Sequence, residues 1–472
     1  MDQSKESHLS PPPEASPVLW QGMKKAQAPI QRFMQLESAG GYVLAGAAVI
    51  ALAWANLSHE TYESLWHTEL GLVGMGHEFV RPLHFWVNDV LMSVFFLLAG
   101  LEIKRQMVEG ELSTPRRAAL PIVAALGGML VPALIYFAFN SDGPAMRGTA
   151  IPVATDIAFA VGVITLLGNR VPAALKILLL TLAVADDIGG IIVIAVFYNS
   201  GIAWTGLLIA IAGAGAFWFL RSVGKRPGWM YYSPLVMVWL GLNEAGIHPT
   251  LSGVVIGLMI PAKAWMTPAA FIASALERLR GAQDQVREGA SAEQSKEASA
   301  TILELSHEAH EALTPLARLE HAIQPLVVFG IMPLFALANA GVYLGGGTMD
   351  ALDLHVGLGI GIGLVVGKPI GVLCATWAST KLGICQMPRG VDARGIALVG
   401  ILAGIGFTVS NFIALLSFTD PVLIATAKLS ILLGSAVSTV AGLAYGRWLF
   451  RKPSERNGIA DTLVAAESSD DI

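Results

Sequence analysis

Four ionisable residues lie inside long apolar stretches of this chain. Asp156 lies in IPVATDIAFAVGVI, the adjacent Asp186 and Asp187 lie in LTLAVADDIGGIIVIAVF, and Lys368 lies in GIGLVVGKPIGVLCATW. A charge at the centre of a bilayer costs about 2.5–3.5 kcal/mol on insertion scales, so such residues mark functional sites. Because both signs of charge are present, we predict a buried site that handles ions or protons.

The two adjacent aspartates can have different tasks. Neighbouring residues on a helix differ by about 100°, so Asp186 and Asp187 point in different directions. Two close carboxylates repel each other when both are ionised, and a proton or a cation can neutralise the same charge. Competition between those two ions is the chemistry of an antiporter. A buried Asp186–Lys368 pair that only fixes helix packing is the plain alternative.

The composition is that of a helical membrane protein. Hydrophobic residues make up 54% of the 472 residues and charged residues 14%, against about 25% charged residues in soluble domains. A spanning helix needs roughly 20 apolar residues, and we expect about twelve such helices in an all-α polytopic fold. The apolar runs fall near 41–57, 85–101, 118–139, 150–167, 171–198, 204–220, 230–242, 247–260, 326–342, 356–378, 395–418 and 421–449.

Basic residues alternate from loop to loop along the chain. Lys24, Lys25 and Arg32 precede the first run, whereas the next loop, HETYESLWHTELGLVGMGHE, has no Lys or Arg. The positive-inside rule therefore places both termini in the cytoplasm. Basic residues flank both sides of 230–260, so we expect the two short runs there to cross as a pair of short helices.

The chain is expected to form one membrane domain with polar ends. We predict a disordered cytoplasmic tail over 1–33, a transmembrane domain over 34–455 and a second disordered tail over 456–472. Residues 264–315 combine helical spacing with mixed charge, which predicts a cytoplasmic amphipathic connector. We expect a lipid environment, no nucleic-acid partner, no cofactor and no enzymatic activity.

Two of the apolar runs favour a break in the helix. The fourth run carries Pro152, Thr155 and Asp156, and the eleventh contains the glycines of GILAGIGFTVSNF. The runs lie seven spans apart and so cross in opposite directions, as in inverted-topology repeats whose discontinuous helices meet at the midplane. An aspartate near the half-helix N-termini and a lysine near the C-termini would balance their partial charges, and Asp156 and Lys368 are the candidates. Tight packing is the alternative role for the glycines.

Several motifs together resemble the NhaA family of bacterial sodium/proton antiporters. NhaA transporters are a known example of inverted-topology repeats with discontinuous helices. The fold expected from the breaks and the resemblance to NhaA are therefore not independent of each other. The matching motifs run in order from about Met34 to Arg451 and cover almost the whole chain. They are FFLLAGLEIKRQMVEGEL, ATDIAFAVGV, LAVADDIGGIIVIAVFY, GIHPTLSGVVIG, RLEHAIQP, MPLFALANAG, GKPIGV and GILAGIGFTVSNFIA.

The resemblance implies roles for the buried residues. Asp187 would be the main sodium or lithium ligand and a proton site. Asp186 would pair with Lys368 and take part in proton exchange, and Asp156 and Thr155 would lie where spans 4 and 11 cross. The family exports sodium across the bacterial inner membrane and takes up more protons than sodium ions per cycle, so transport would be electrogenic. The oligomeric state stays open, with a homodimer as one candidate.

The resemblance also implies a pH-sensing cluster at the cytoplasmic funnel. Two positions depart from the family pattern, because Gln106 stands where a second acid is common and Gln324 where a histidine is familiar. For Glu102 and Arg105 the alternative is an interfacial ion pair worth little energy. For His248 the alternative is a packing role. The candidates are Glu102, Arg105, Glu320 and His321, with His248 towards the other side.

Three other classes of membrane protein compete with an antiporter. A passive cation channel could use acidic residues, but it would need neither a facing lysine nor opposed broken helices. An intramembrane aspartyl protease needs aspartates from different helices, usually in Tyr-Asp and Gly-x-Gly-Asp contexts, and neither motif occurs here. A sodium-coupled symporter of similar fold is the closest rival, although the sequence reveals no pocket for an organic substrate.

Overall fold

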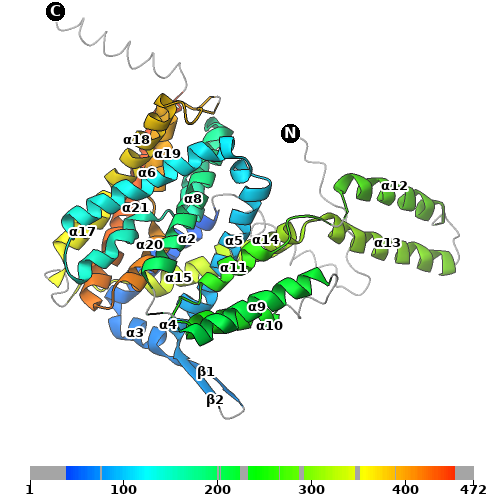
Figure 1. Cartoon of the computed structure of the whole chain (residues 1–472), viewed down its shortest axis with the longest axis horizontal. Helices are drawn as coiled ribbons and strands as arrows, with labels where there is room; N and C mark the ends of the chain where they lie inside the picture. The colour runs from blue at the N-terminus through cyan, green and yellow to red at the C-terminus, as the bar shows by residue number, and fades with distance from the viewer. Residues whose placement is uncertain are drawn as a thin grey trace, which may run out of the picture.

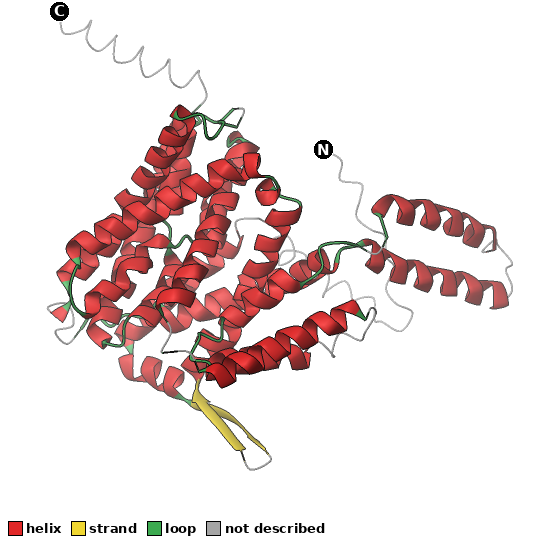
Figure 2. Ribbon diagram, viewed as in Figure 1, coloured by secondary structure: helices red, strands yellow, loops and turns green. Residues whose placement is uncertain are grey.

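The chain folds into a mostly helical body, as the computed structural model shows (Figures 1 and 2). Both tails predicted from the sequence, 1–33 and 456–472, lie outside the residues that the structure describes. The helical body agrees with a polytopic helical membrane protein. The described residues are 39–74, 77–198, 201, 203–223, 232–264, 266–285, 292–345, 351–388 and 390–451.

Eight continuous helical segments of the described chain are long and apolar enough to cross a membrane. Each coincides with one of the apolar runs of the sequence, which explains why it forms a helix of spanning length. They are α2 (Ala39–Leu57), Leu83–Val108 (α4, Leu83–Phe85; η1, Trp86–Leu91; α5, Met92–Val108), α6 (Pro115–Phe139), α8 (Ala173–Phe197), α9 (Trp204–Ser222), Pro315–Asn339 (α14, Pro315–Leu326; η6, Val327–Ile331; α15, Met332–Asn339), Leu354–Lys381 (α17, Leu354–Ile362; η7, Gly363–Gly367; α18, Lys368–Lys381) and α21 (Pro421–Leu449).

Proline accounts for two of the π-helical turns inside these spans. Pro333 and Pro369 each lie two residues after a π-helical segment, η6 and η7. Proline has no N–H to donate and its ring clashes with the carbonyl four residues earlier, so a widened turn relieves the strain. Lys368 follows η7 directly, and the widened turn therefore sets the direction in which this lysine leaves its helix.

Two pairs of shorter elements are together long and apolar enough for a span but are bent at a short break. η3 (Pro144–Val153), a 3-10 helix, and α7 (Ile157–Leu166) meet at 41°, and α19 (Ala393–Ala403) and α20 (Phe407–Ser417) meet at 48°. The breaks fall beside Asp156 and within the glycine-rich stretch of the eleventh run. Counted as one span each, these pairs bring the described chain to ten candidate spans.

The remaining two apolar runs fold as helices shorter than a span. α10 (Tyr232–Glu244) has 13 residues and α11 (Leu251–Met259) has 9, against the roughly 20 residues that a crossing requires. α10 packs against α9, and α11 packs against α5. By length alone, the described helices therefore do not reach the expected number of twelve spans.

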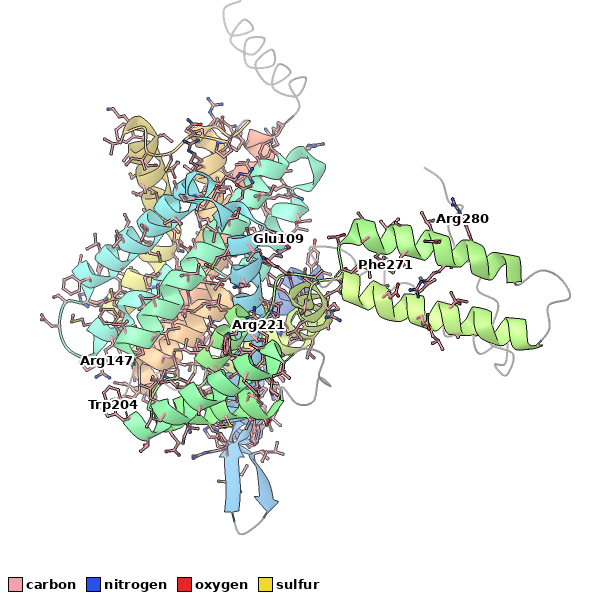
Figure 3. All side chains as sticks on the ribbon, turned by 45° about the vertical axis from the view of Figure 1, so that its right-hand side comes forward. Glu109, Arg147, Trp204, Arg221, Phe271 and Arg280 are labelled. Carbon is pink, nitrogen blue, oxygen red and sulfur yellow. The ribbon has the colours of Figure 1, made fainter. Side chains whose placement is uncertain are left out.

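Two hairpins extend from the helical body (Figures 1 and 3). Strands β1 (Glu69–Gly74) and β2 (His77–Pro82) pair antiparallel in a segment that was expected to be a loop of an all-α fold. α12 (Pro268–Gln285) and α13 (Ala292–Ala312) form a helical hairpin within the predicted connector 264–315. The other short elements are α3 (His59–His67), η2 (Glu111–Ser113) and η4 (Gly168–Arg170).

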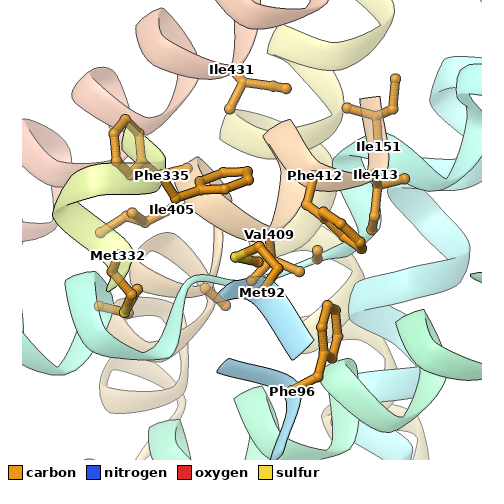
Figure 4. Packing of buried hydrophobic residues seen from close by; sticks show 14 of the residues in the cluster. Met92, Phe96, Ile151, Met332, Phe335, Ile405, Val409, Phe412, Ile413 and Ile431 are labelled. Atoms are coloured by element: carbon orange, nitrogen blue, oxygen red, sulfur yellow. The ribbon is translucent and has the colours of Figure 1, made fainter. Parts of the chain in front are cut away.

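The second half of the bent pair α19–α20 lies in the centre of the hydrophobic core (Figure 4). The ring centroid of Phe412 on α20 is 5.2 Å from that of Phe96 on α5 and 6.5 Å from that of Phe335 on α15. All three rings are buried. Because tightly packed interiors tolerate little movement, this packing holds the N-terminus of α20 in a fixed place among the surrounding helices.

A close contact between two glycines joins α6 to the lysine-bearing helix α18. A methyl group at Gly371 would lie 2.1 Å from the carbonyl oxygen of Gly127. Gly371→Ala must therefore push the helices apart, and we expect the melting temperature in detergent to fall, with a loss of about 1–3 kcal/mol in stability. Gly361→Ala is the matched control, because a methyl group there meets nothing within 4 Å. Equal melting temperatures for the two variants would contradict this account of the contact.

Candidate functional site

The breaks in the two bent pairs lie against each other. The backbone N–H of Asp156 donates to the carbonyl oxygen of Ile405 at 2.7 Å, and the hydroxyl of Ser410 donates to the carbonyl oxygen of Ile151 at 2.8 Å. A break inside a membrane leaves backbone polar groups that must find partners within the protein. Here each broken pair satisfies part of the other, so the crossing point is a structural unit built from both.

Asp156 caps the N-termini of both half-helices at the crossing. Its Oδ1 accepts from the backbone N–H of Phe159 in α7 at 3.0 Å. Its Oδ2 accepts from the backbone N–H and the hydroxyl of Thr408 in α20, at 3.0 and 2.6 Å. A carboxylate at a helix N-terminus satisfies free N–H groups and opposes the positive end of the helix dipole. One buried aspartate therefore neutralises two helix ends.

Lys368 and Asp186 form a fully buried ion pair. The Nζ atom of Lys368 on α18 contacts Oδ2 of Asp186 on α8, and both side chains have 0% exposure. The same Nζ atom donates to the hydroxyl of Thr155 at 2.7 Å. A buried pair of opposite charges is retained only where geometry and hydrogen bonds offset desolvation, and Thr155 supplies one of those hydrogen bonds.

Thr155 connects the ion pair to the end of a half-helix. Its Oγ1 lies 2.7 Å from Oδ2 of Asp186 and 2.9 Å from the carbonyl oxygen of Ala403, the last residue of α19. A hydroxyl has one proton and can donate to only one of these acceptors at a time. Thr155 can therefore shift its donation between the carboxylate and the helix end, depending on the charge that the carboxylate carries.

Among the described residues Asp187, unlike Asp186, has no ion-pair partner. Both aspartates line a small cavity of about 10 Å³, whose apolar walls include Phe95, Phe96 and Ile191. The Oδ1 atoms of Asp186 and Asp187 are both buried and have no hydrogen-bond partner among the described residues. A buried polar atom without a partner is costly. A water molecule, a proton or a small cation in this cavity would relieve that cost.

The structure brings three of the five proposed pH sensors together. Arg105 on α5 lies with Nε 3.0 Å from Oε2 of Glu102 and 3.5 Å from Oε1 of Glu320 on α14. The side chains of both glutamates are 14% exposed and that of Arg105 is 40% exposed. Nε2 of Gln106 donates to the remaining carboxylate oxygen of Glu102, Oε1, at 2.9 Å. An ion pair this exposed is worth little stability, but it does couple α5 to α14.

The two histidines lie outside the ion pairs of this cluster. His321 follows Glu320 on α14, and its side chain is exposed. His248 precedes α11, whose Gly253 and Gly257 pack against the backbone of α5 at Ser93 and Gly100. α11 thus runs parallel to α5, and His248 lies towards the N-terminal end of α5. The ion pair of Arg105 lies at the C-terminal end.

Several polar groups of the buried region were not singled out from the sequence as site residues. Thr408 directly follows the GIGF break, and that position is the one signal that could have marked it as a partner of Asp156. A second, largely buried polar cluster joins the segment Leu83–Val108 to α15. His84 Nε2 lies 3.0 Å from Oδ1 of Asn339, and Asn339 Nδ2 donates to Oδ1 of Asn88 at 2.8 Å.

Comparisons with known proteins cover nearly the whole chain. The family described as "Na+/H+ antiporter 1" matches residues 31–445. The chain is 47% identical over 451 residues to "Na(+)/H(+) antiporter NhaA 2" of Sorangium cellulosum, covering 93% of this chain and 94% of that protein. It is 45% identical over 460 residues to the Myxococcus xanthus protein of the same name, covering 97% of each chain. It is 43% identical over 452 residues to "Na(+)/H(+) antiporter NhaA" of Bordetella petrii, covering 94% and 96%.

Proposed function

This chain belongs to the NhaA family of Na+/H+ antiporters, and we propose that it exchanges sodium ions for protons at the adjacent carboxylates of Asp186 and Asp187. The observation that carries the proposal is their placement. Both carboxylates line a small cavity, and each has one buried oxygen that lacks a partner among the described residues; Asp186 is in addition paired with a buried lysine. Channel and symporter functions are not favoured, because the relatives are named antiporters over nearly their full length.

Asp187 is the main cation ligand and a proton site in this proposal. It has a buried oxygen without a partner among the described residues, and the cavity beside it is small enough to hold one small ion at a time. Asp186 exchanges its proton through its pair with Lys368, and Thr155 follows by changing the acceptor of its hydroxyl. Asp156 keeps the two half-helix N-termini in place beside the site. Sodium and protons then compete for the same negative charge.

The proposed direction of transport rests on the family resemblance and on the distribution of Lys and Arg among the loops. Sodium leaves the cell as protons enter, with more protons than sodium ions per cycle, across the bacterial inner membrane. The alternation of Lys and Arg from loop to loop supports a cytoplasmic location for both termini. Lithium as a second substrate and a homodimeric assembly belong to the same proposal.

The architecture we propose has twelve membrane helices in inverted repeats. Ten candidate spans support it when each bent pair counts once, and the short helices α10 and α11 would supply the other two. The bent pairs would then be the discontinuous helices of spans 4 and 11, with their breaks at the midplane. The contacts between the two breaks, including the one from Asp156 to Ile405, support this arrangement.

pH regulation is proposed for the cluster that couples α5 to α14. Glu102, Arg105 and Glu320 lie in contact and are partly exposed, so protonation of a glutamate would loosen the link between the two helices. His321 lies next to this cluster in sequence and is assigned to it. His248 is assigned a separate place towards the other end of α5, consistent with its distance along the helix.

The test is the pH dependence of sodium affinity in liposomes that contain the purified protein. We expect sodium and lithium, but not potassium, to collapse an imposed pH gradient. A carboxylate must lose its proton before it binds the cation. The apparent sodium affinity should therefore weaken as pH falls, by about tenfold per pH unit for each competing proton. An affinity that stays constant from acid to alkaline pH would mean separate sites and would contradict the proposal.

A further inference from the structure

The hairpin of α12 and α13 carries an exposed apolar stripe. Arg278 on α12 bonds to Glu304 at 3.2 Å and to Glu308 at 3.0 Å on α13, and these ion pairs mark the side on which the helices meet. Leu305 and Ala312 of α13 are buried. By contrast Ile272, Leu276 and Leu279 of α12 are 49–56% exposed. Exposed residues three and four positions apart form one face of a helix.

The exposed apolar residues of both helices lie on the same face of the hairpin. At about 100° per residue, Ile272, Leu276 and Leu279 lie roughly 100–160° around α12 from Arg278. Ile302 and Leu303, which are 60% and 72% exposed, lie roughly 60–160° around α13 from Leu305, in the same sense. The two helices run antiparallel, so the same sense of rotation brings both groups to one side. We call this surface the hairpin face.

The other surfaces of the hairpin are polar. Arg280 points away from α13 (Figure 3), and Glu277 and Glu304 are exposed. An isolated helix pair of this kind exposes apolar area that a partner normally covers. The two candidate partners are a lipid surface and a protein segment, and the charge of the hairpin distinguishes them.

Charge disfavours the membrane as the partner of the hairpin face. Residues 268–313 contain eight acidic and four basic residues, a formal net charge of −4. Helices that bind the membrane surface carry Lys and Arg on the polar side, and the cytoplasmic leaflet is itself anionic. The partner that fits the hairpin face is therefore an apolar segment with positive charge.

We propose that the hairpin face binds the N-terminal segment of the same chain, residues 18–36. Between Glu14 and Glu37 the sequence has no acidic residue, so this segment is positively charged, whereas the hairpin as a whole has a negative net charge. It also supplies apolar side chains for the exposed stripe. The basic residues are Lys24, Lys25 and Arg32, and the apolar ones include Leu19, Trp20, Met23, Ile30, Phe33 and Met34.

The start of the described chain lies within reach of the hairpin. A methyl group at Gly40 would lie 2.3 Å from Cγ1 of Val328, in the span that begins at Pro315, three residues after α13. The distance along this span from Pro315 to Val328 is about 20 Å, at 1.5 Å per residue. The chain from Trp20 to Ala39 can extend to about 60 Å. The tether also gives the segment a high local concentration at the hairpin.

A photo-reactive amino acid at position 276 of the full-length protein tests the contact directly. After irradiation in liposomes, adducts from Leu276 should map by mass spectrometry to residues 18–36 of the same polypeptide. The same probe at Glu277, on the polar side of α12, is the matched control and should give few such adducts. Adducts from position 276 to lipid, to an isotope-labelled second copy or to no peptide at all would overturn the proposal.

Reversing the charge of the segment tests the complementarity. The combined change Lys24→Glu, Lys25→Glu and Arg32→Glu should lower the adduct yield from position 276 about tenfold, which corresponds to a 1.4 kcal/mol difference in binding. Lys24→Arg with Lys25→Arg keeps the charge and should keep the yield. The melting temperature should be the same for both sets. An unchanged yield after charge reversal would refute the proposed pairing.

Discussion

Asp187→Asn is expected to abolish sodium-driven proton exchange while the protein remains folded in the membrane. The side chain faces a cavity with one carboxylate oxygen unpaired, so an amide of the same shape keeps the packing and removes the charge. Removing a residue that hydrogen-bonds to a metal ligand typically lowers metal affinity 10–100-fold. The loss of the ligand itself should lower the exchange rate by more than about 100-fold. Proton flux in liposomes after a sodium pulse measures this rate.

Two further variants make the Asp187 result interpretable. Asp187→Glu keeps a carboxylate but displaces it by one methylene, and it should retain a fraction of the exchange. Asp142→Asn removes an exposed acidic group and should leave the rate unchanged. Full exchange in Asp187→Asn, with a melting temperature equal to that of the parent, would rule out the assignment of Asp187 as the cation ligand.

Lys368→Ala is expected to destabilise the protein strongly. The lysine is fully buried and contacts Asp186 and Thr155, so its removal leaves a buried carboxylate without a counter-charge. Breaking such a pair by removing one partner costs about 3–5 kcal/mol. Asp186 would then remain in its neutral form, which removes one titrating group and makes exchange less electrogenic. Thermal unfolding in detergent and the dependence of transport on membrane potential measure the two effects.

Charge-conserving and paired changes separate the lysine's charge from its shape. Lys368→Arg should keep folding and part of the transport, because the counter-charge stays. Combining Lys368→Met with Asp186→Asn removes both charges and should recover much of the stability that Lys368→Ala loses, as expected for coupled sites. If Lys368→Ala is as stable and as sensitive to potential as the parent, the proposed pairing is wrong.

The sequence predicted the long spans well, because a run of about 20 apolar residues has few alternatives to a membrane helix. The two observed bends fall in the runs where Pro152, Asp156 and the glycines after Gly400 disfavour a continuous helix. The strands β1 and β2 were missed. Each has six residues, and glycine in ELGLVG obscures the alternation that signals a strand.

The partners of the charged residues were less accessible from the sequence. A 100° step separates Asp186 from Asp187, but the step does not say which one faces Lys368, because that depends on how α8 is rotated in the bundle. The hydroxyl of Thr408 reaches Asp156 only because the two breaks meet in space. Contacts between segments more than 200 residues apart depend on packing of the whole fold, which local patterns do not encode.

Proton release on sodium binding tests most directly whether the two ions share one site. Sodium is titrated into the purified protein in weakly buffered detergent solution, and the protons released are measured with a pH-sensitive dye. Sharing predicts that sodium binding expels protons in the parent, and that Asp187→Asn neither binds sodium nor releases protons. Sodium that binds with undiminished affinity and expels no proton at any pH would contradict a shared carboxylate site.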